Sequence, residues 1–248
     1  MATSIVEKLM SVREKRRLKA VLFDADFTLA DSGPLWNGGF QYLAKKIAKE
    51  IGTDELELMT YIKAENQRLF QEMGAHPSKY WQVALRVAER YGLDPERVRE
   101  WNKTAVGKIY LKAPKLYPGS KQVVGELSQA GFATAIVSHV PEGLSRIRMK
   151  EWGWEEMPAF PTTTLKDKGP EAYLRAVAGL SIRPEEAMVV GDSVKGDMAA
   201  ALEAGIRHRI WVRPTWNPFL DGDKSVLEGV PEIERIGQLA GAIIKHFG

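Results

Sequence analysis

The sequence predicts an α/β protein in which a doubly wound, Rossmann-like parallel sheet forms a core domain that carries an inserted all-helical cap domain. Two observations lead to this prediction. Short apolar runs alternate with amphipathic helical segments, as expected for strands that are buried on both faces of a parallel sheet. Between residues 34 and 114 the helical periodicity continues without a strand-like run. Roughly 80 residues are too many for one crossover helix, so we interpret this stretch as a second domain.

The strand-like segments of the core are 19–24, 132–138, 187–192 and 209–212, with a weaker one at 159–163. The segments with helical patterns in the core are a short amphipathic N-terminal helix at 5–10 and longer ones at 120–130, 170–180, 197–204 and 233–247. Four helices are expected in the insertion, at 40–51, 54–72, 78–91 and 95–110. Strand–helix–strand repetition implies right-handed crossovers and hence the doubly wound sheet.

Residues with special backbone properties mark several of these boundaries. Gly131 and Gly205 end helical patterns, as glycine often does, and Asp94-Pro95-Glu96 is a strong helix start because an acid, a proline and a second acid stand in the preferred order. Pro34 and Pro114 lie near the two expected hinges. We therefore predict a core domain of residues 1–33 plus 115–248 and a cap domain of residues 34–114.

Composition excludes several classes of protein. The chain has 248 residues, a formal net charge of +3, no cysteine and four histidines. Disulfides, zinc–thiolate sites and cysteine nucleophiles are therefore excluded, and no basic stripe points to nucleic acid. No apolar run approaches the ~20 residues of a membrane span, and the N-terminus does not resemble a signal peptide. We expect a cytoplasmic protein, as a monomer or a homodimer, that binds neither nucleic acid nor a membrane.

Acidic residues gather where the predicted strands end. Asp24 and Asp192 end two strands, Asp26 lies two residues beyond the first, and Asp197 begins the helix after the third. Ligands of open α/β sheets bind at this edge. Two carboxylates ~4 Å apart repel by ~4 kcal/mol at an effective dielectric near 20, so the cluster needs a cation, a shared proton or both. Hard oxygen ligands without imidazole or thiolate favour Mg²⁺.

Two motifs resemble those of the haloacid dehalogenase-like superfamily. Residues 23–29 (FDADFTL) resemble its DxDxT signature, and residues 190–197 (VGDSVKGD) resemble its GDS…D signature. Residues 117–119 (YPG) resemble the turn that reopens the core after the cap. Each motif is short, but their order, strand context and separation agree. The resemblance covers the core, residues 19–33 and 115–247.

The resemblance implies a Mg²⁺-dependent phosphatase that acts on a small phosphorylated metabolite. Asp24 would attack phosphorus and become an aspartyl phosphate, and Asp26 would protonate the leaving alcohol and then activate water. Thr28 would orient these two acids. Metal ligation would involve Asp24, the Asp26 backbone carbonyl and Asp192, while Asp197 would support the metal's waters or a lysine.

The same resemblance assigns the phosphate-binding residues. Ser138 and the following backbone N–H would hold phosphoryl oxygens, and His139, where relatives often have Asn, faces either the substrate or solvent. A lysine should neutralise the phosphate. The family's usual Lys-Pro-x-Pro spacing would place it at Asp167, so we favour Lys168 and keep Lys166 as the alternative.

The chain departs from the family at Phe27, where glycine is common, and the turn there has to accommodate a bulky side chain. Candidate substrate contacts from the cap are Trp36, Phe40, Arg68, Lys79 and Trp81, although each also suits the cap core or a solvated face. Four other functions remain open, three of them catalytic. A sugar-phosphate mutase shares every core residue, a 2-haloacid dehalogenase generally lacks the second acid, phosphonate cleavage needs a cap lysine that nothing singles out, and a non-catalytic phosphate-binding member usually loses the nucleophile.

Overall fold

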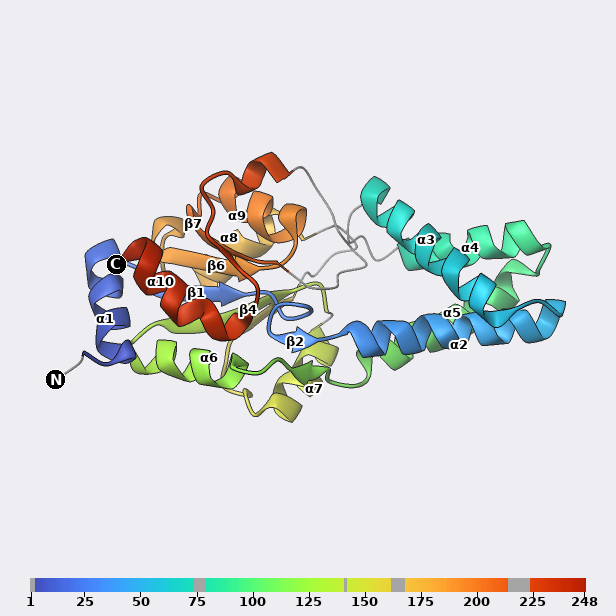
Figure 1. Ribbon diagram of the computed structural model, residues 1–248, viewed down its shortest axis with the longest axis horizontal. Coiled ribbons are helices and arrows are strands. Elements are labelled where there is room, and N and C mark those ends of the chain that lie inside the picture. The colour runs from blue at the N-terminus through green and yellow to red at the C-terminus, as the bar shows by residue number, and fades with distance from the viewer. Residues whose placement is uncertain (1–2, 74–78, 141, 162–167, 214–223) are drawn as a thin grey trace.

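The core is built on a six-stranded parallel sheet (Figure 1). The computed structural model describes residues 3–73, 79–140, 142–161, 168–213 and 224–248. The strand order is β5-β4-β1-β6-β7-β8, with β1 at Ala20–Phe23, β4 at Ala133–Ser138, β5 at Ala159–Pro161, β6 at Ala187–Gly191, β7 at His208–Val212 and β8 at Glu232–Ile233. The predicted fold class is confirmed. β1 lies between β4 and β6, so the ends of these three strands are adjacent.

Helices cover both faces of this sheet because successive side chains of a strand point to opposite sides. Phe23 packs in the cluster that includes side chains of α1 (Ile5–Arg16), α6 (Ser120–Gln129), α7 (Glu142–Trp152) and α10 (Leu239–Phe247). Its neighbour Leu22 packs in the cluster on the other face, with α8 (Pro170–Gly179) and α9 (Ala200–Glu203). Because both faces of the sheet are covered by hydrophobic clusters, β1, β4 and β6 are continuous apolar runs in the sequence.

Several elements differ from the sequence expectations. Helix α7 was not predicted, because its sequence EGLSRIRMKEW is mostly charged or small and gives a weak apolar stripe. The helix expected at 197–204 begins earlier, as a π-helical turn over Val194–Ala199 that continues into α9. The final helix starts at Leu239, because β8 and a 3₁₀ turn, Ile236–Gln238, occupy the preceding residues. Two more 3₁₀ turns lie at Pro184–Glu186 and Lys224–Leu227.

The helices of the insertion pack around a hydrophobic core of their own. They are α2 (Gly33–Ile51), α3 (Glu55–Met73), α4 (Lys79–Tyr91) and α5 (Pro95–Tyr110). Helix α2 begins before the expected residue 40, since Pro34 fits the first turn of a helix. Asp94 caps α5 by accepting a hydrogen bond from the Glu96 N–H at 3.1 Å. A short antiparallel pair, β2 (Ala30–Asp31) with β3 (Lys115–Leu116), joins the chain segments that leave and re-enter the core.

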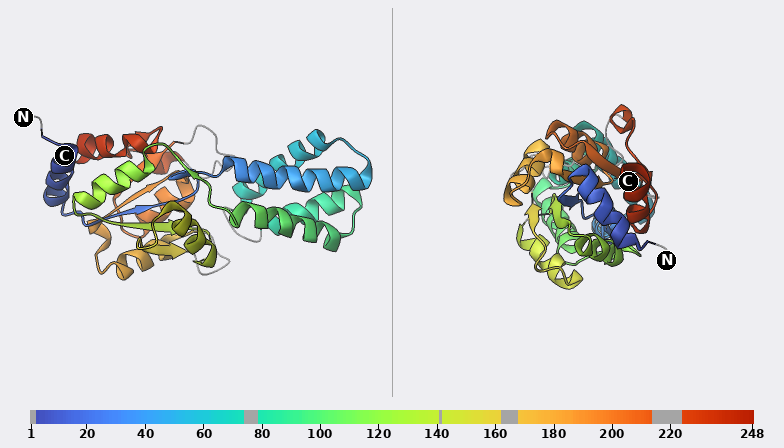
Figure 2. Two further views of the ribbon diagram at one scale, coloured as in Figure 1. Left: turned by 90° about the horizontal axis from the view of Figure 1, so that it is seen from below. Right: turned by 90° about the vertical axis from the view of Figure 1, so that its left-hand side faces the viewer.

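The molecule is elongated, with α2–α5 extending beyond the ends of the strands, while the two chain termini lie at the opposite end of the core (Figures 1 and 2). There α1 packs beside α10, and the Arg16 Nε donates a hydrogen bond to the Phe247 carbonyl at 2.8 Å. Among the residues that the structure describes, no helix is long and apolar enough to cross a membrane.

Candidate active site

Acidic side chains meet at the carboxyl edge of the sheet, where β1, β4 and β6 end side by side. Asp24 follows β1, Asp192 follows β6, and Ser138 is the last residue of β4. The Asp24 N–H donates to the Val190 carbonyl at 2.9 Å, which fixes the start of the loop after β1. Carboxylate oxygens of Asp24, Asp192 and Asp197 lie within 4.8 Å of one another. The parallel topology therefore brings together residues that are far apart in the sequence.

The ammonium group of Lys168 lies at the centre of this cluster. Its Nζ donates to Asp24 Oδ1 at 2.5 Å and to the Val137 carbonyl at 3.2 Å, and it pairs with Asp197 Oδ1. The Lys168 side chain is only 1% exposed. Lys168, favoured as the phosphate-neutralising lysine, thus lies beside Asp24, and the alternative, Lys166, lies outside the described residues, so the choice between them stays a prediction.

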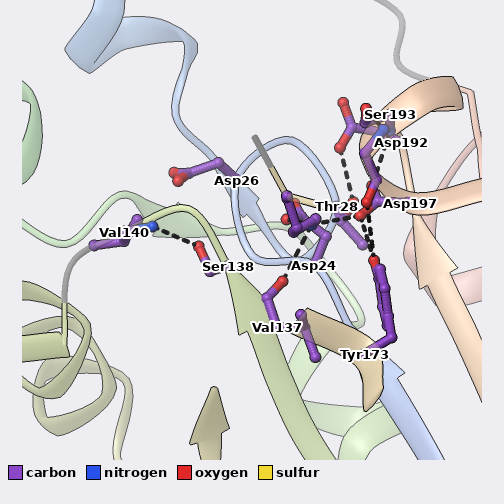
Figure 3. Close-up of polar contacts among 12 residues, drawn as sticks. Asp24, Asp26, Thr28, Val137, Ser138, Val140, Tyr173, Asp192, Ser193 and Asp197 are labelled. Atoms are coloured by element: carbon purple, nitrogen blue, oxygen red, sulfur yellow. Dashed lines mark hydrogen bonds and ion pairs between the residues drawn. The ribbon is translucent and has the colours of Figure 1, made fainter. Parts of the chain in front are cut away.

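Asp197 is held rigidly by donors on both of its oxygens (Figure 3). Its Oδ1 accepts from the Tyr173 hydroxyl at 2.7 Å as well as pairing with Lys168, and its Oδ2 accepts from the Ser193 N–H at 2.9 Å. A side chain at Gly191 would prevent this arrangement, because a Cβ there would lie 2.2 Å from Asp197 Oδ2. The glycine of the GDS…D motif therefore lets the Asp197 carboxylate press against the end of β6.

Burial sets the electrostatics of the cluster. Loss of hydration raises the pKa of Asp24 to about 7, although Lys168 opposes the rise, while Asp197 and Asp26 add to it. Burial by itself would lower the pKa of Lys168, but Asp197 and Asp24 outweigh it and hold that pKa well above its usual range. Burial and Asp197 also raise the pKa of Tyr173, so this hydroxyl keeps its proton and acts as a donor. Near neutral pH the lysine is charged, and Asp24 lies close to its titration midpoint.

The donor set fits a hard divalent cation. Three acidic side chains lie around one ammonium group, and every candidate ligand atom among them is a carboxylate oxygen. Asp197 already accepts three donors, whereas for Asp24 the recorded side-chain bond is to one oxygen. Asp24 is therefore more open to a metal ion than Asp197, which instead pairs with Lys168. The Trp211 indole N–H donates to the Asp192 carbonyl at 2.8 Å and fixes that strand end.

The carboxylate of Asp26 points away from this cluster (Figure 3). Arg148 Nη1 donates to both Asp26 oxygens, at 2.9 and 3.0 Å, and the Ser32 hydroxyl bonds to Asp26 Oδ1. The expected acid–base residue is therefore near the cluster in the sequence, but its side chain is turned toward the junction with the inserted helices.

Three further predicted residues lie at the same edge of the sheet. Thr28 was expected to orient Asp24 and Asp26, but its buried hydroxyl donates to Asp192 Oδ1 at 3.1 Å. Ser138 is buried, and its Oγ accepts from the Val140 N–H at 3.2 Å, which shapes the turn after β4. His139 is half-buried, with its Nε2 facing Gly196, the residue before Asp197 in the π-helical turn.

The structure shows how the turn after Asp26 accommodates Phe27 at a position where the resembled family often has glycine. It has a φ of 64°, the left-handed conformation that glycine favours. Its side chain is buried and belongs to the hydrophobic core of the inserted helices. The turn thus has a backbone conformation typical of glycine, and the ring is buried among the inserted helices, where apolar burial is favourable.

Three of the five residues considered as substrate contacts from the inserted helices have other contacts in the structure. Trp36 and Phe40 are buried in the hydrophobic core of the inserted helices, and Arg68 is an exposed side chain that pairs with Glu65 and Glu72. The side chains of Lys79 and Trp81 lie outside the described residues. For Trp36 and Phe40 the structure therefore favours the core interpretation.

Sequence reasoning missed three residues of the site, namely Ser32, Arg148 and Tyr173. Arg148 lies on the unpredicted helix α7, and nothing in its sequence context marks it. Ser32 carries only the weak signal of a polar residue before a helix. Tyr173 could have been suspected, because it lies one helical turn after Pro170, on the helix that follows Lys168.

Comparison with known proteins assigns the family. The family model for haloacid dehalogenase-like hydrolases matches residues 18–205. This stretch spans more than half of the chain and includes both motifs and the acidic cluster, so the protein belongs to the haloacid dehalogenase-like hydrolases.

Individual relatives agree with this assignment. A glyceraldehyde 3-phosphate phosphatase of Methanopyrus kandleri is 26% identical over 234 residues, covering 88% of this chain and 92% of the relative. A phosphoglycolate phosphatase of Xylella fastidiosa is 28% identical over 193 residues, with coverage of 76% and 77%. The crystal structure of a putative β-phosphoglucomutase of Thermotoga maritima matches with a TM-score of 0.67 at 19% identity, covering 92% of this chain and 99% of that one. This last likeness supports the fold.

Proposed function

We propose that the protein is a Mg²⁺-dependent phosphomonoester hydrolase that acts on a small phosphorylated metabolite through an aspartyl-phosphate intermediate on Asp24. The observation that carries the proposal is the contact of Lys168 with both Asp24 and Asp197 at the carboxyl edge of the sheet. A buried cation beside a buried carboxylate is suited to a dianionic phosphate that approaches the same carboxylate. The relatives named as phosphatases support this direction.

In the first displacement, an oxygen of Asp24 attacks phosphorus, the bond from phosphorus to the ester oxygen breaks, and Asp26 gives its proton to the leaving alcohol. In the second, Asp26 takes a proton from water, the water oxygen attacks phosphorus, and the acyl-phosphate bond breaks to free Asp24 and inorganic phosphate. Lys168 holds Asp24 in position and offsets charge on the phosphoryl oxygens. The Ser138 hydroxyl and backbone donors after β4 bind those oxygens, and His139 lies beside them.

Mg²⁺ would be held by the carboxylates of Asp24 and Asp192 and the Asp26 carbonyl, where it would offset the negative charge that accumulates on the phosphoryl oxygens. Asp192 is positioned for this role by Thr28 and by the strand end. Asp197 pairs with Lys168 and would support either that lysine or water around the metal. The π-helical turn and Gly191 set the Asp197 carboxylate in place for this role.

The inserted helices, residues 34–114, would act as a cap domain that excludes water and selects the leaving group, while residues 1–33 and 115–248 form the catalytic domain. Two features support this division, a separate hydrophobic core and the β2–β3 pair at the junction. Relatives named for glyceraldehyde 3-phosphate and phosphoglycolate suggest a short phosphorylated carbon chain as the substrate.

The test measures inorganic phosphate released from p-nitrophenyl phosphate by the wild type and by Asp24→Asn, with Mg²⁺ and with EDTA. We expect release that requires Mg²⁺ and is lost in Asp24→Asn. Reduction of the quenched enzyme with borohydride should convert an aspartyl phosphate at position 24 to homoserine, which peptide mass spectrometry detects. Phosphate release by Asp24→Asn at the wild-type rate would refute Asp24 as the nucleophile.

A further inference from the structure

Asp26 belongs to a polar cluster that touches both ends of the inserted helices. Arg148, from the core helix α7, donates through Nη1 to both Asp26 oxygens. Its Nη2 donates to the Ile109 carbonyl at 3.0 Å, in the last turn of α5. Ser32, whose hydroxyl also bonds to Asp26, immediately precedes α2. The cluster therefore lies where the chain leaves the core and where it returns.

The ion pair between Arg148 and Asp26 is difficult to break because the arginine is buried. The Arg148 side chain is 2% exposed, against 23% for Asp26. Its guanidinium cannot lose its proton, and its Nε is buried without a hydrogen-bond partner. If Asp26 turned toward Asp24 while α5 stayed in place, a buried cation would lose its carboxylate partner, which is strongly unfavourable. Asp26 is thus free to turn only when the surroundings of Arg148 change.

The end of α5 supplies part of those surroundings. In addition to the Ile109 carbonyl, the Tyr110 ring lies 5.4 Å from the Arg148 guanidinium carbon, within the range of a cation–π contact. A shift of α5 would remove both contacts and admit water to the guanidinium.

A second link between the same loop and the helices is Phe27. This residue follows Asp26 directly, and its side chain is buried in the core of the inserted helices. Movement of the helices would therefore also pull on the backbone next to Asp26.

We propose that Arg148 is a positioning residue that couples the acid–base residue Asp26 to the position of the cap, because it holds Asp26 turned away from Asp24 until the end of α5 moves. The inference rests on the proposed function, in which Asp26 transfers protons. A contact made only in the turned-away arrangement shifts the population toward that arrangement, so its removal favours the arrangement in which Asp26 faces Asp24.

The experiment compares two substrates that differ in their need for a proton. Nitrophenolate leaves p-nitrophenyl phosphate without protonation, whereas the alcohol of glycerol 2-phosphate needs the proton from Asp26. We would measure kcat/KM with Mg²⁺ for both substrates in the wild type, Arg148→Met and Ser32→Ala. The matched control is Arg146→Met, since Arg146 is an exposed arginine of the same helix that pairs with Glu142.

We expect the ratio of kcat/KM for glycerol 2-phosphate to that for p-nitrophenyl phosphate to rise at least about threefold in Arg148→Met. The ratio should also rise in Ser32→Ala and stay unchanged in Arg146→Met. In an Asp26→Asn background, Arg148→Met should leave the ratio unaltered, because the effect passes through Asp26. A merely structural role for Arg148 would lower both rates in proportion.

A ratio that stays constant or falls in Arg148→Met, or a change that persists in the Asp26→Asn background, would overturn the coupling. If Arg148→Met does not fold, Ser32→Ala and Arg148→Lys decide the question, because lysine keeps the charge but lacks the fork that joins Asp26 to Ile109. A wild type that hydrolyses neither substrate would refute the proposed function and the coupling with it. An active wild type whose ratio does not respond to the variants would refute the coupling alone.

Discussion

Replacing Asp24 with Asn should stabilise the metal-free protein at neutral pH while it abolishes activity. The pKa of Asp24 rises from its usual value of 3.8 to about 7 because the side chain is buried. Such a rise, at 1.36 kcal/mol per pKa unit, corresponds to about 4 kcal/mol. A carboxyl with a raised pKa contributes stability that is complete below its unfolded value and is lost as the pH rises through the folded value. The wild type thus loses stability between pH values of about 4 and 7, and the Asn variant, which cannot ionise, does not.

The assay is urea unfolding in EDTA at several pH values from 4 to 8. At pH 8 the variant should exceed the wild type by up to about 4 kcal/mol, and the difference should shrink toward zero near pH 4. Addition of Mg²⁺ should stabilise the wild type more than the variant, since binding to the folded state raises its stability. If the variant is less stable than the wild type at pH 8 in EDTA, the Asp24–Lys168 pair outweighs the cost of burial, and the reasoning fails.

Three other substitutions test separate features. Lys168→Met leaves the buried acids without their cation, so the free energy of unfolding, measured in urea with EDTA, should fall by about 3–5 kcal/mol. An unchanged stability would contradict the pairing of Lys168 with Asp24 and Asp197. Phe27→Gly relieves a left-handed φ but removes a ring from the core of the inserted helices. We therefore expect the free energy of unfolding to fall by about 2–4 kcal/mol in the same assay. A gain in stability would show that backbone strain dominates. The Arg183 N–H and then Lys19 lower the pKa of Glu186 to about 2, so its contribution is present above the usual 4.5 and is lost as the pH falls through 2. Glu186→Gln should therefore lower the melting temperature at pH 6 and not at pH 2, and an equal loss at both values would argue against the ion pair.

The sequence predicted those parts of the site that depend on topology. Asp24, Ser138 and Asp192 each end or follow an apolar run, and parallel strands place such residues at one edge whatever the details of packing. The orientation of side chains was not predictable in the same way. Asp26 lies two residues from Asp24, yet it turns to an arginine that is 122 residues further along the chain, on a helix without a clear apolar stripe. Thr28 likewise bonds across strands to Asp192.

Lys168, the lysine proposed to bind phosphate, was only partly predictable from the sequence. Counting back from Pro170 by the family's spacing leads to Asp167, and the sequence left Lys166 and Lys168 as neighbours of that position. The structure shows how Lys168 reaches the acidic cluster. Gly169 is extended, with a φ of −103° and a ψ of −173°, so the chain enters α8 directly after Lys168. The Lys168 side chain then runs along the end of β4 to the Val137 carbonyl and the two acids.

The arrangement around Lys168 also accounts for the role of Tyr173. With Lys168 one residue nearer to α8 than the family spacing places it, the first turn of that helix lies against the ammonium group, and the Tyr173 ring is 6.0 Å from Nζ. The Tyr173 hydroxyl then gives Asp197 a further donor, so the acid that orients the lysine is itself fixed from α8. Lysine, tyrosine and Asp197 thus form one buried unit. The position of Lys168, one residue beyond the family spacing, is therefore accompanied by a support from the helix that follows it.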